Sequence, residues 1–146
     1  MLVSSILQNK GNVVYDINPD DTVFEAIKLM SDKGIGALLV IDDDGQLCGI
    51  ISERDYRDKV ILKGRTSKTT KVREIMTSDV YWVPPTESVN NCMQLMTEKK
   101  FRHLPVMEDG DVVGVISIGD LVKQIISEQK LEINHLKKYI GGSYPG

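Results

Sequence analysis

Two short polar motifs with the same spacing are the residues best suited to chemistry. Ser52 lies three residues before Asp55, and Ser117 lies three residues before Asp120. Each serine ends an apolar segment, and each aspartate falls where a helix is expected to begin. An ionised carboxylate can accept two hydrogen bonds from a vicinal diol, and a helix start offers N–H groups and a positive dipole end to a phosphate. The same spacing also fits a plain helix cap, and the two roles can coexist.

Other reactive groups are few. The chain has two histidines, His103 and His135, and no phosphate-binding loop, zinc-ligand spacing or paired nucleophile and base. We therefore expect no catalytic residue and no metal site. Cys48 and Cys92 lie in apolar patterns, which favours core packing in a reduced, intracellular compartment over a disulfide framework.

The two motifs belong to a longer internal repeat. Val14 and Pro19 recur 66 residues later as Val80 and Pro85, within segments that share further identities. One residue is lost in an acidic turn, so the later matches, such as Ser52 with Ser117, are 65 residues apart. Matches at two consecutive offsets indicate a duplication.

Each repeat predicts the same elements. An extended segment leads to a helix capped by Thr22 or Ser88, then to a strand (37–41 or 104–107), an acidic turn with glycine, a strand (47–52 or 112–117) and a second helix. This β-α-β-β-α plan, found twice, predicts an α+β fold of two repeats, each a three-stranded sheet with helices, packed with pseudo-twofold symmetry. The predicted divisions are a leading helix (1–9), the first repeat (10–62), a linker (63–75), the second repeat (76–126) and a C-terminal helical extension (127–146).

Composition narrows the class of protein. The chain has 146 residues, 41% of them hydrophobic and 27% charged, and its 18 basic and 21 acidic residues give a net charge of −3. Charges of both signs are interspersed, so nucleic acid is not an expected partner. No apolar run approaches the roughly 20 residues of a membrane span. We expect a cytoplasmic protein with no membrane partner, or one of an organellar matrix if a targeting peptide is missing.

The segments GIISERDY (49–56), RHLPV (102–106) and GVISIGDL (114–121) resemble the cystathionine β-synthase (CBS) domain family, in particular its small stand-alone proteins with two CBS domains. The resemblance covers residues 10–125. It implies a non-catalytic regulatory or energy-sensing module that binds adenosine-containing ligands in two clefts between the repeats. AMP is the first choice of ligand, with ADP, ATP or NAD as alternatives. A homodimer and an unidentified effector protein are the implied partners.

The resemblance also implies which residues line the clefts. The signature Ser and Asp of one repeat would contact ribose and phosphate opposite residues of the other repeat. The implied set is Val14, Tyr15, Ile35, Gly36, Ala37, Ser52, Arg54, Asp55, Val80, Tyr81, Phe101, Arg102, His103, Leu104, Pro105, Ser117 and Asp120. Arg102 and His103 would lie on the phosphate side, where the first repeat has Gly36 and Ala37, so the two clefts are expected to be chemically unequal.

Two other functions remain open from the sequence. The pair could be a structural or adaptor protein that binds only other proteins, and a small enzyme is the weakest alternative. His103 could be a structural histidine and His135 an ordinary exposed residue. Positive charge near one cleft is expected from six residues, although the linker part of this set could be only a solvated loop: Arg54, Arg57, Lys63, Arg65, Lys68 and Lys71. The apolar positions along 2–7 and 125–140 exceed what the core needs, which favours the homodimer.

Overall fold

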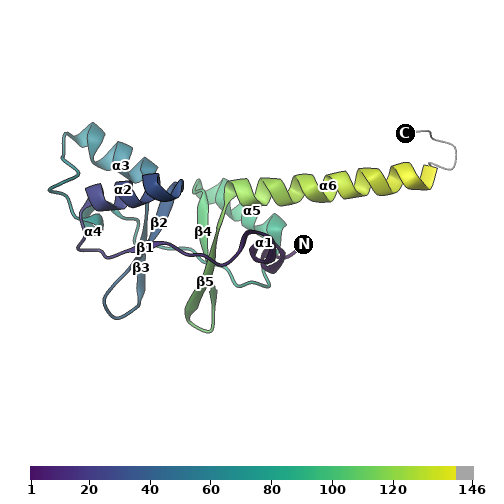
Figure 1. Ribbon diagram of the computed structural model, residues 1–146, viewed down its shortest axis with the longest axis horizontal. Helices are drawn as coiled ribbons and strands as arrows, with labels where there is room; N and C mark the ends of the chain where they lie inside the picture. The colour runs from purple at the N-terminus through teal and green to yellow at the C-terminus, as the bar shows by residue number, and fades with distance from the viewer. Residues whose placement is uncertain (141–146) are drawn as a thin grey trace. The chain divides into compact units, whose positions relative to one another are not determined.

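The computed structural model describes residues 1–140, with side chains for residues 1–137. The chain divides into two compact units (Figure 1). The first-repeat unit is Val13–Trp82, and the second-repeat unit combines Met1–Asn12 with the chain from Val83 onward. In chain order the elements are α1 (Val3–Lys10), β1 (Asp16–Ile17), α2 (Val23–Lys33), β2 (Ala37–Ile41), β3 (Leu47–Ser52), α3 (Glu53–Lys59), the 3-10 turn η1 (Ile61–Lys63), α4 (Val72–Ile75), α5 (Val89–Lys99), β4 (His103–Glu108), β5 (Asp111–Ser117) and α6 (Ile118–Ile140).

A three-stranded sheet forms the centre of the first-repeat unit, in the order β1-β2-β3. β1 pairs parallel with β2, and α2 is the crossover between them, while β2 pairs antiparallel with β3 through the acidic turn. Asp42 stabilises this turn because its Oδ1 accepts hydrogen bonds from the N–H groups of Asp44 (3.0 Å) and Gln46 (2.9 Å). The strands predicted at 37–41 and 47–52 are confirmed.

The long helix of each repeat begins at its predicted cap. Thr22 Oγ1 accepts a hydrogen bond from the N–H of Glu25 at 3.2 Å, and Ser88 Oγ accepts one from the N–H of Asn91 at 3.1 Å. Each cap satisfies a backbone donor that the helix itself leaves without a partner. The buried residues of these helices recur every three or four positions and so share one helical face: Val23, Ala26 and Met30 in α2, and Val89, Cys92 and Met96 in α5.

The sheet of the second-repeat unit has two strands, β4 and β5, where the duplication predicted three. The third strand is reduced to one parallel bridge between Val83 and Val106. In the first repeat the N–H of Leu39 donates to the carbonyl of Tyr15 at 3.3 Å. The equivalent of Leu39 is Pro105, which has no N–H, so the ladder ends there. The mixed α/β fold of two related repeats is confirmed, with one sheet narrower than expected.

A short helix docks in the same way on each unit. The N–H of Val72, in α4, donates to the carbonyl of Asp21 at 2.9 Å, and the N–H of Val3, in α1, donates to the carbonyl of Glu87 at 2.9 Å. Asp21 and Glu87 are equivalent positions of the duplication. Each unit therefore carries the helix that precedes the other repeat, which explains why Met1–Asn12 belongs to the second-repeat unit.

Two glycines allow these docked helices to approach the strands closely. A Cβ atom on Gly114 would lie 2.6 Å from Leu7 Cδ2. A Cβ atom on Gly49 would lie 2.6 Å from Met76 Sδ and 3.0 Å from the carbonyl oxygen of Thr77. The two separations of 2.6 Å are shorter than real Cβ contacts. The close packing of these two segments on the strands therefore depends on glycine at both equivalent positions.

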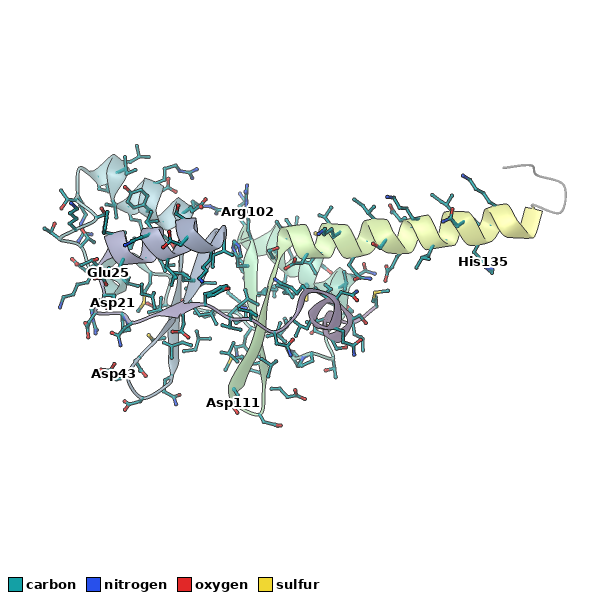
Figure 2. The ribbon with its side chains drawn as sticks, in the orientation of Figure 1. Asp21, Glu25, Asp43, Arg102, Asp111 and His135 are labelled. Carbon is teal, nitrogen blue, oxygen red and sulfur yellow. The ribbon has the colours of Figure 1, made fainter. Side chains whose placement is uncertain are left out.

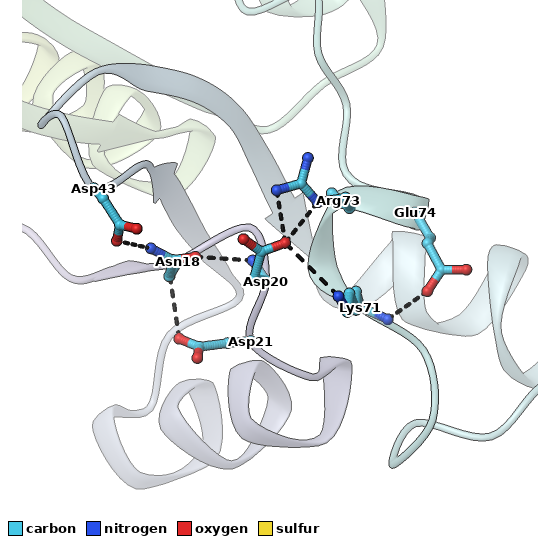
Figure 3. A network of polar contacts seen from close by, with 7 residues as sticks. All are labelled: Asn18, Asp20, Asp21, Asp43, Lys71, Arg73 and Glu74. Atoms are coloured by element: carbon cyan, nitrogen blue, oxygen red, sulfur yellow. Dashed lines mark hydrogen bonds and ion pairs between the residues drawn. The ribbon is translucent and has the colours of Figure 1, made fainter.

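Polar contacts also fasten α4 to the first-repeat unit (Figure 3). Arg73 donates to Asp20 Oδ1 from Nε at 2.8 Å, and its terminal nitrogen lies 2.6 Å from the same oxygen. On the other side of Asp20, Asn18 Nδ2 donates to Asp43 Oδ1 at 2.7 Å. The end of the predicted linker is thus held by side chains as well as by backbone.

The last helix continues without a break from the end of β5. α6 runs from Ile118 to Ile140 and so includes both the end of the predicted second repeat and part of the predicted extension. Its first turns close the core of the second-repeat unit, where Leu121 is buried beside α1, α5 and the two strands. Residues 141–146 of the predicted extension lie outside the described residues.

Candidate functional site

The first motif lies at the junction of β3 and α3. Ser52 Oγ accepts a hydrogen bond from the N–H of Asp55 at 3.2 Å, and Asp55 Oδ2 accepts one from the N–H of Ser52 at 3.0 Å. This reciprocal pair is a capping box, so the cap interpretation is confirmed for this motif. Asp55 is 8% exposed and is the only buried charged residue among residues 1–137.

A lysine neutralises this buried carboxylate. Lys59 Nζ lies 3.0 Å from Asp55 Oδ1, one helical turn further along α3. The same ammonium donates to the carbonyl of Ile75, in α4, at 2.9 Å. One Asp55 oxygen therefore faces Ser52 and the other faces Lys59, and the pair also links α3 to the docked helix α4.

The second motif has the same local geometry. Asp120 Oδ2 accepts from the N–H of Ser117 at 2.8 Å, and Ser117 Oγ accepts from the N–H of Asp120 at 3.1 Å. The strand β5 and the helix α6 thus position a serine and a carboxylate as β3 and α3 do in the other unit. Because the motif recurs at equivalent junctions, each carboxylate is held in a defined place at a helix start.

A lysine also pairs with Asp120, but it comes from the other end of the chain. Lys10 Nζ, at the end of α1, lies 2.7 Å from Asp120 Oδ2 and 2.9 Å from the carbonyl oxygen of Val115. Burial of the Asp120 carboxyl favours its neutral form, but the hydrogen bonds from Lys10 and from the Ser117 N–H favour the carboxylate more. The pKa of Asp120 therefore lies below its usual range.

The strand register places further predicted residues beside each motif. Ala37 lies opposite Ser52, and His103 lies opposite Ser117. Backbone hydrogen bonds extend the correspondence, because the N–H of Glu53 donates to the carbonyl of Gly36 at 3.1 Å and the N–H of Ile118 donates to the carbonyl of Arg102 at 2.8 Å. Each motif therefore lies beside the strand that precedes it in its own unit, β2 for Ser52 and β4 for Ser117. The crosswise groupings implied by the resemblance stay predictions.

The remaining predicted residues differ in exposure. Leu104 and Pro105 are buried in β4, while Arg54, Tyr81 and Arg102 are exposed. Partly buried residues complete the predicted set: Val14, Tyr15, Ile35, Gly36, Val80 and Phe101. Lys33 Nζ lies 5.3 Å from the centre of the Tyr15 ring, which gives that ring a cation–π contact within its own unit.

Most of the cations near the linker already have partners. Arg65 lies 2.6 Å from Glu74, Lys71 lies 4.0 Å from Asp20, and Arg57 lies 2.8 Å from Asp58. Lys68 stands 5.3 Å from the centre of the Phe24 ring. These contacts favour a solvated, internally balanced surface over a patch that attracts an anionic ligand.

The cysteines and His135 carry no sign of a reactive centre. Cys92 is buried, and desolvation followed by the charge of Glu87 raises the pKa of its thiol to about 11. Desolvation followed by the charge of Asp42 also raises the pKa of Cys48. His135 projects from the exposed end of α6 (Figure 2). Among residues 1–137 no three His, Cys, Asp or Glu side chains gather where they could hold a metal ion. Over the described helices, none is at once long and apolar enough to cross a membrane.

Two site residues were missed from the sequence, Lys10 and Lys59. Lys59 follows Asp55 by four residues on one helix, a spacing at which opposite charges meet, so a local signal was available. Lys10 reaches Asp120 only because α1 docks on the second-repeat unit, and no local pattern reports that contact.

Known proteins identify the family. The CBS domain model matches residues 13–61 and 72–127. The chain is 41% identical over 150 residues to the CBS domain-containing protein CBSX3, mitochondrial, of Arabidopsis thaliana, a match that covers 97% of this chain and 73% of that protein. This chain covers only 35% of a 33.4 kDa protein of Thermofilum pendens and 21% of the CBS domain-containing protein CBSCBSPB5 of Arabidopsis thaliana.

Solved structures agree with the sequence match. A putative signal-transduction protein with CBS domains from Burkholderia ambifaria is 52% identical, with a TM-score of 0.85 over 88% of this chain and 96% of that one. The CBS domain pair of protein MJ0100, solved with 5-methylthioadenosine and S-adenosyl-L-methionine, is 25% identical, with a TM-score of 0.78 over 88% of this chain and 98% of that one. This chain therefore belongs to the CBS domain family and carries a tandem pair of CBS domains.

Proposed function

We propose that this protein is a non-catalytic regulatory module that binds adenosine-containing ligands through its two Ser-x-x-Asp motifs. The observation that carries the proposal is the repeated geometry at Ser52–Asp55 and Ser117–Asp120, where a capping box fixes a carboxylate at a strand-to-helix junction. A carboxylate that is already oriented can accept both hydroxyls of a ribose without first losing side-chain freedom.

The lysines on these carboxylates suit such a ligand. A ribose diol would replace the ammonium of Lys59 on Asp55, or that of Lys10 on Asp120. The displaced ammonium would remain beside the ligand, where it can pair with a phosphate. At each motif a ligand would thus replace an internal ion pair. Loss of that ion pair would loosen the contact of α4, through Lys59, or of α1, through Lys10, with the rest of its unit.

AMP is the proposed ligand, with ADP, ATP and NAD as alternatives from the same chemical class. The protein MJ0100 was solved with two adenosine compounds, which supports the class without selecting a member. Arg102 and His103 are proposed to contact phosphate, whereas Gly36 and Ala37 offer no charge at the equivalent positions. Occupancy of the two motifs is therefore expected to differ.

A second candidate is an adaptor that binds only proteins. One observation favours it: the Asp55 and Asp120 carboxylates each already accept a hydrogen bond from the serine of their motif and pair with a lysine of their own unit. In that case the motifs serve as caps and ion pairs that hold α4 and α1 in place.

The proposed setting is an intracellular homodimer that acts on an effector protein. The Arabidopsis relative is named as mitochondrial, so an organellar matrix is the alternative to the cytoplasm. Neither nucleic acid nor a membrane is proposed as a partner, because the two charge signs are nearly balanced in number.

A thermal-shift screen tests the proposal directly. The purified protein is melted with AMP, ADP, ATP, NAD, NADH and S-adenosylmethionine at concentrations up to the millimolar range. A ligand at a hundred times its dissociation constant stabilises a fold by about 2.7 kcal/mol, which is a readily measured shift. Asp55→Asn and Asp120→Asn should reduce the shift, while Asp111→Asn, at an exposed position, should not. Absence of a shift with all six compounds, in a folded protein, would make the adaptor the better account.

A further inference from the structure

The last helix is much longer than its own unit needs. Near its start Leu121 is buried, and Ile118 and Ile125 pack against the core of the second-repeat unit. From Gln129 to Lys137 every side chain is exposed. Figure 1 shows this half of α6 extending past the other elements of its unit. Nothing within the described residues of that unit covers it.

The exposed part of α6 carries an apolar stripe in its sequence. Val122, Ile126, Ile133 and Leu136 are 43%, 45%, 50% and 51% exposed. Together with Gln129 they follow one another at intervals of four, three, four and three residues. That alternation is the a/d pattern of a coiled coil, which keeps one seam facing a partner helix. We call these five residues the α6 seam.

One group of contacts between α6 and its own chain lies on the side of the helix opposite Ile126 and Ile133. The N-terminal amino group of Met1 lies 4.0 Å from Glu128, and Gln124 Nε2 contacts Met1 Sδ. At 100° per residue, Gln124 and Glu128 fall on the opposite side of the helix from Ile126 and Ile133. Ile118 and Ile125, which pack on the core, lie closer to the seam, on the side of Gln129 and Leu136, but the four apolar seam residues remain 43–51% exposed.

We propose that the α6 seam pairs with the same seam of a second copy of this chain, as a parallel two-stranded coiled coil. Ile126 and Ile133 take the a positions, and Val122, Gln129 and Leu136 take the d positions. Branched Ile at both a positions, with Leu136 at one of the three d positions, partly matches the combination that favours two parallel strands. Gln129 would meet its own equivalent across the axis, where two amides can hydrogen-bond to each other. Leu131, 68% exposed on the outer side, is not explained by this pairing.

The charges beside the seam select the parallel orientation. The e positions are Lys123, Lys130 and Lys137, and Glu132 takes a g position. In a parallel pair a g residue faces the e residue five positions later, so Glu132 faces the partner subunit's Lys137. In an antiparallel pair the e positions face each other, which would bring lysine against lysine. Charge complementarity therefore points to a parallel second copy as the occupant.

This inference takes its stoichiometry from the proposed homodimer and is independent of the proposed ligand. Light scattering on the full chain at tens of micromolar measures the mass. Ile133→Asp with Leu136→Asp should convert dimer into monomer, because each carboxylate would be placed in the apolar seam. Both residues are half exposed, so the fold should survive, and circular dichroism checks that it does. Ser127→Asp with Asn134→Asp, at outward-facing positions of the same helix, should leave the mass unchanged.

Cysteine cross-linking tests the orientation. Gln129→Cys and Leu136→Cys, made separately and oxidised mildly, should each form a disulfide-linked dimer, because identical d residues face each other only in a parallel, in-register pair. Ser127→Cys on the outer face should not. Lys137→Glu should weaken the dimer about tenfold by opposing two carboxylates, and Glu132→Lys added to it should restore the affinity.

The outcomes separate the two proposals. A dimeric mass that survives Ile133→Asp with Leu136→Asp, without cross-linking at 129 and 136, would overturn the coiled coil and leave the homodimer to another surface. A monomeric wild-type chain would overturn both. Ligand-dependent melting shifts, measured on the same variants, report on the nucleotide proposal alone.

Discussion

The ammonium of Lys10 lies 2.7 Å from Asp120 Oδ2, although 110 residues separate the two in sequence. The same nitrogen donates to the carbonyl of Val115 at 2.9 Å. The Lys10 side chain thereby links the end of α1 to Val115 in β5 and to Asp120 in the first turn of α6. The contact joins the helix that leads the chain to the carboxylate proposed to hold a ribose.

Lys10→Met should therefore destabilise the fold modestly. The change removes a charge-assisted hydrogen bond and leaves a partly buried carboxylate without its main partner. We expect a loss of about 1 kcal/mol in the free energy of unfolding, near the lower end for such bonds because the Lys10 side chain is 37% exposed. Chemical denaturation at neutral pH measures it. Lys28→Met, at an exposed position of α2, is the matched control and should change the free energy by much less.

The pH dependence of this contact has a definite sign. The folded-state pKa of Asp120 is lowered, since hydrogen bonds from Lys10 and the Ser117 N–H outweigh the opposing effect of burial. A carboxyl with a lowered folded pKa stabilises the fold fully above its unfolded pKa of about 3.9, and that contribution is lost as the pH falls through the folded value. The stability difference between wild type and Asp120→Asn should be largest near neutral pH and shrink in acid. A difference that stays constant between pH 7 and pH 3 would contradict this assignment.

The local parts of this structure could be predicted from the sequence, and the contacts between distant segments could not. Thr22 and Ser88 cap their helices as predicted, because a cap depends on residues three positions apart. The Ser-x-x-Asp motifs were found because the duplication repeats them. No such local signal shows that α1 belongs to the second-repeat unit and α4 to the first-repeat unit. Both assignments depend on packing, at Gly114 and at Gly49.

The narrower second sheet shows a different limit. Symmetry between the repeats predicted a third strand, and a single substitution of the equivalent Leu39 by Pro105 removed the donor that the strand requires. The sequence therefore contains the reason for the narrower sheet, because proline at position 105 is incompatible with the third strand that the repeat predicts. In the site, the pairing of Lys59 with Asp55 could also have been predicted from the sequence, because the two residues are four positions apart on one helix. The pairing of Lys10 with Asp120 could be found only from the fold.

Gly49→Ala should be strongly destabilising. The new methyl group would lie 2.6 Å from Met76 Sδ and 3.0 Å from the Thr77 carbonyl oxygen, which is engaged by the N–H of Ile50. The sulfur can move, but the backbone oxygen cannot without loss of that bond, so a cost of roughly 1–3 kcal/mol is expected. Thermal and chemical denaturation measure it.

Gly119→Ala is the control for that change. Its Cβ atom would meet nothing closer than Ser117 Oγ at 3.6 Å, and the position is helical. Alanine should therefore leave stability unchanged or raise it by about 0.5–1 kcal/mol. Equal losses for the two variants would mean that Met76 and Thr77, which follow α4, do not approach β3 as closely as described.

Protonation of His103 should strengthen binding of a phosphorylated ligand. An imidazolium attracts a phosphate more strongly than a neutral imidazole does, so AMP affinity should fall as the pH rises from 5.5 to 8. Adenosine, which has no phosphate, should show a smaller change, and His103→Gln should remove the difference between the two compounds. AMP titrations that superimpose at both pH values, in folded protein, would return His103 to a structural role beside Ser117.

The two signature aspartates should have separable effects on ligand binding. Each carboxylate would supply hydrogen bonds to the ribose worth about 1.5–3 kcal/mol, so Asp55→Ala or Asp120→Ala should weaken binding at its own motif roughly tenfold to a hundredfold. We expect Asp55→Ala to reduce AMP binding more, because the resemblance groups Asp55 with Arg102 and His103. Calorimetric titration with AMP and with adenosine measures both the affinity and the number of sites.

The cost to the unliganded fold must be measured alongside, because both aspartates are also caps. Asp55 is 8% exposed and also pairs with Lys59, so Asp55→Ala should cost more than the ~1 kcal/mol expected of a lost cap. The Asp120 side chain is 20% exposed against 11% for that of Asp55, so Asp120→Ala should cost less than Asp55→Ala. Ligand affinity, corrected for the folded fraction, should nevertheless fall in both. If both variants lose only stability and bind AMP as the wild type does, the motifs are helix caps, and the adaptor becomes the function to pursue.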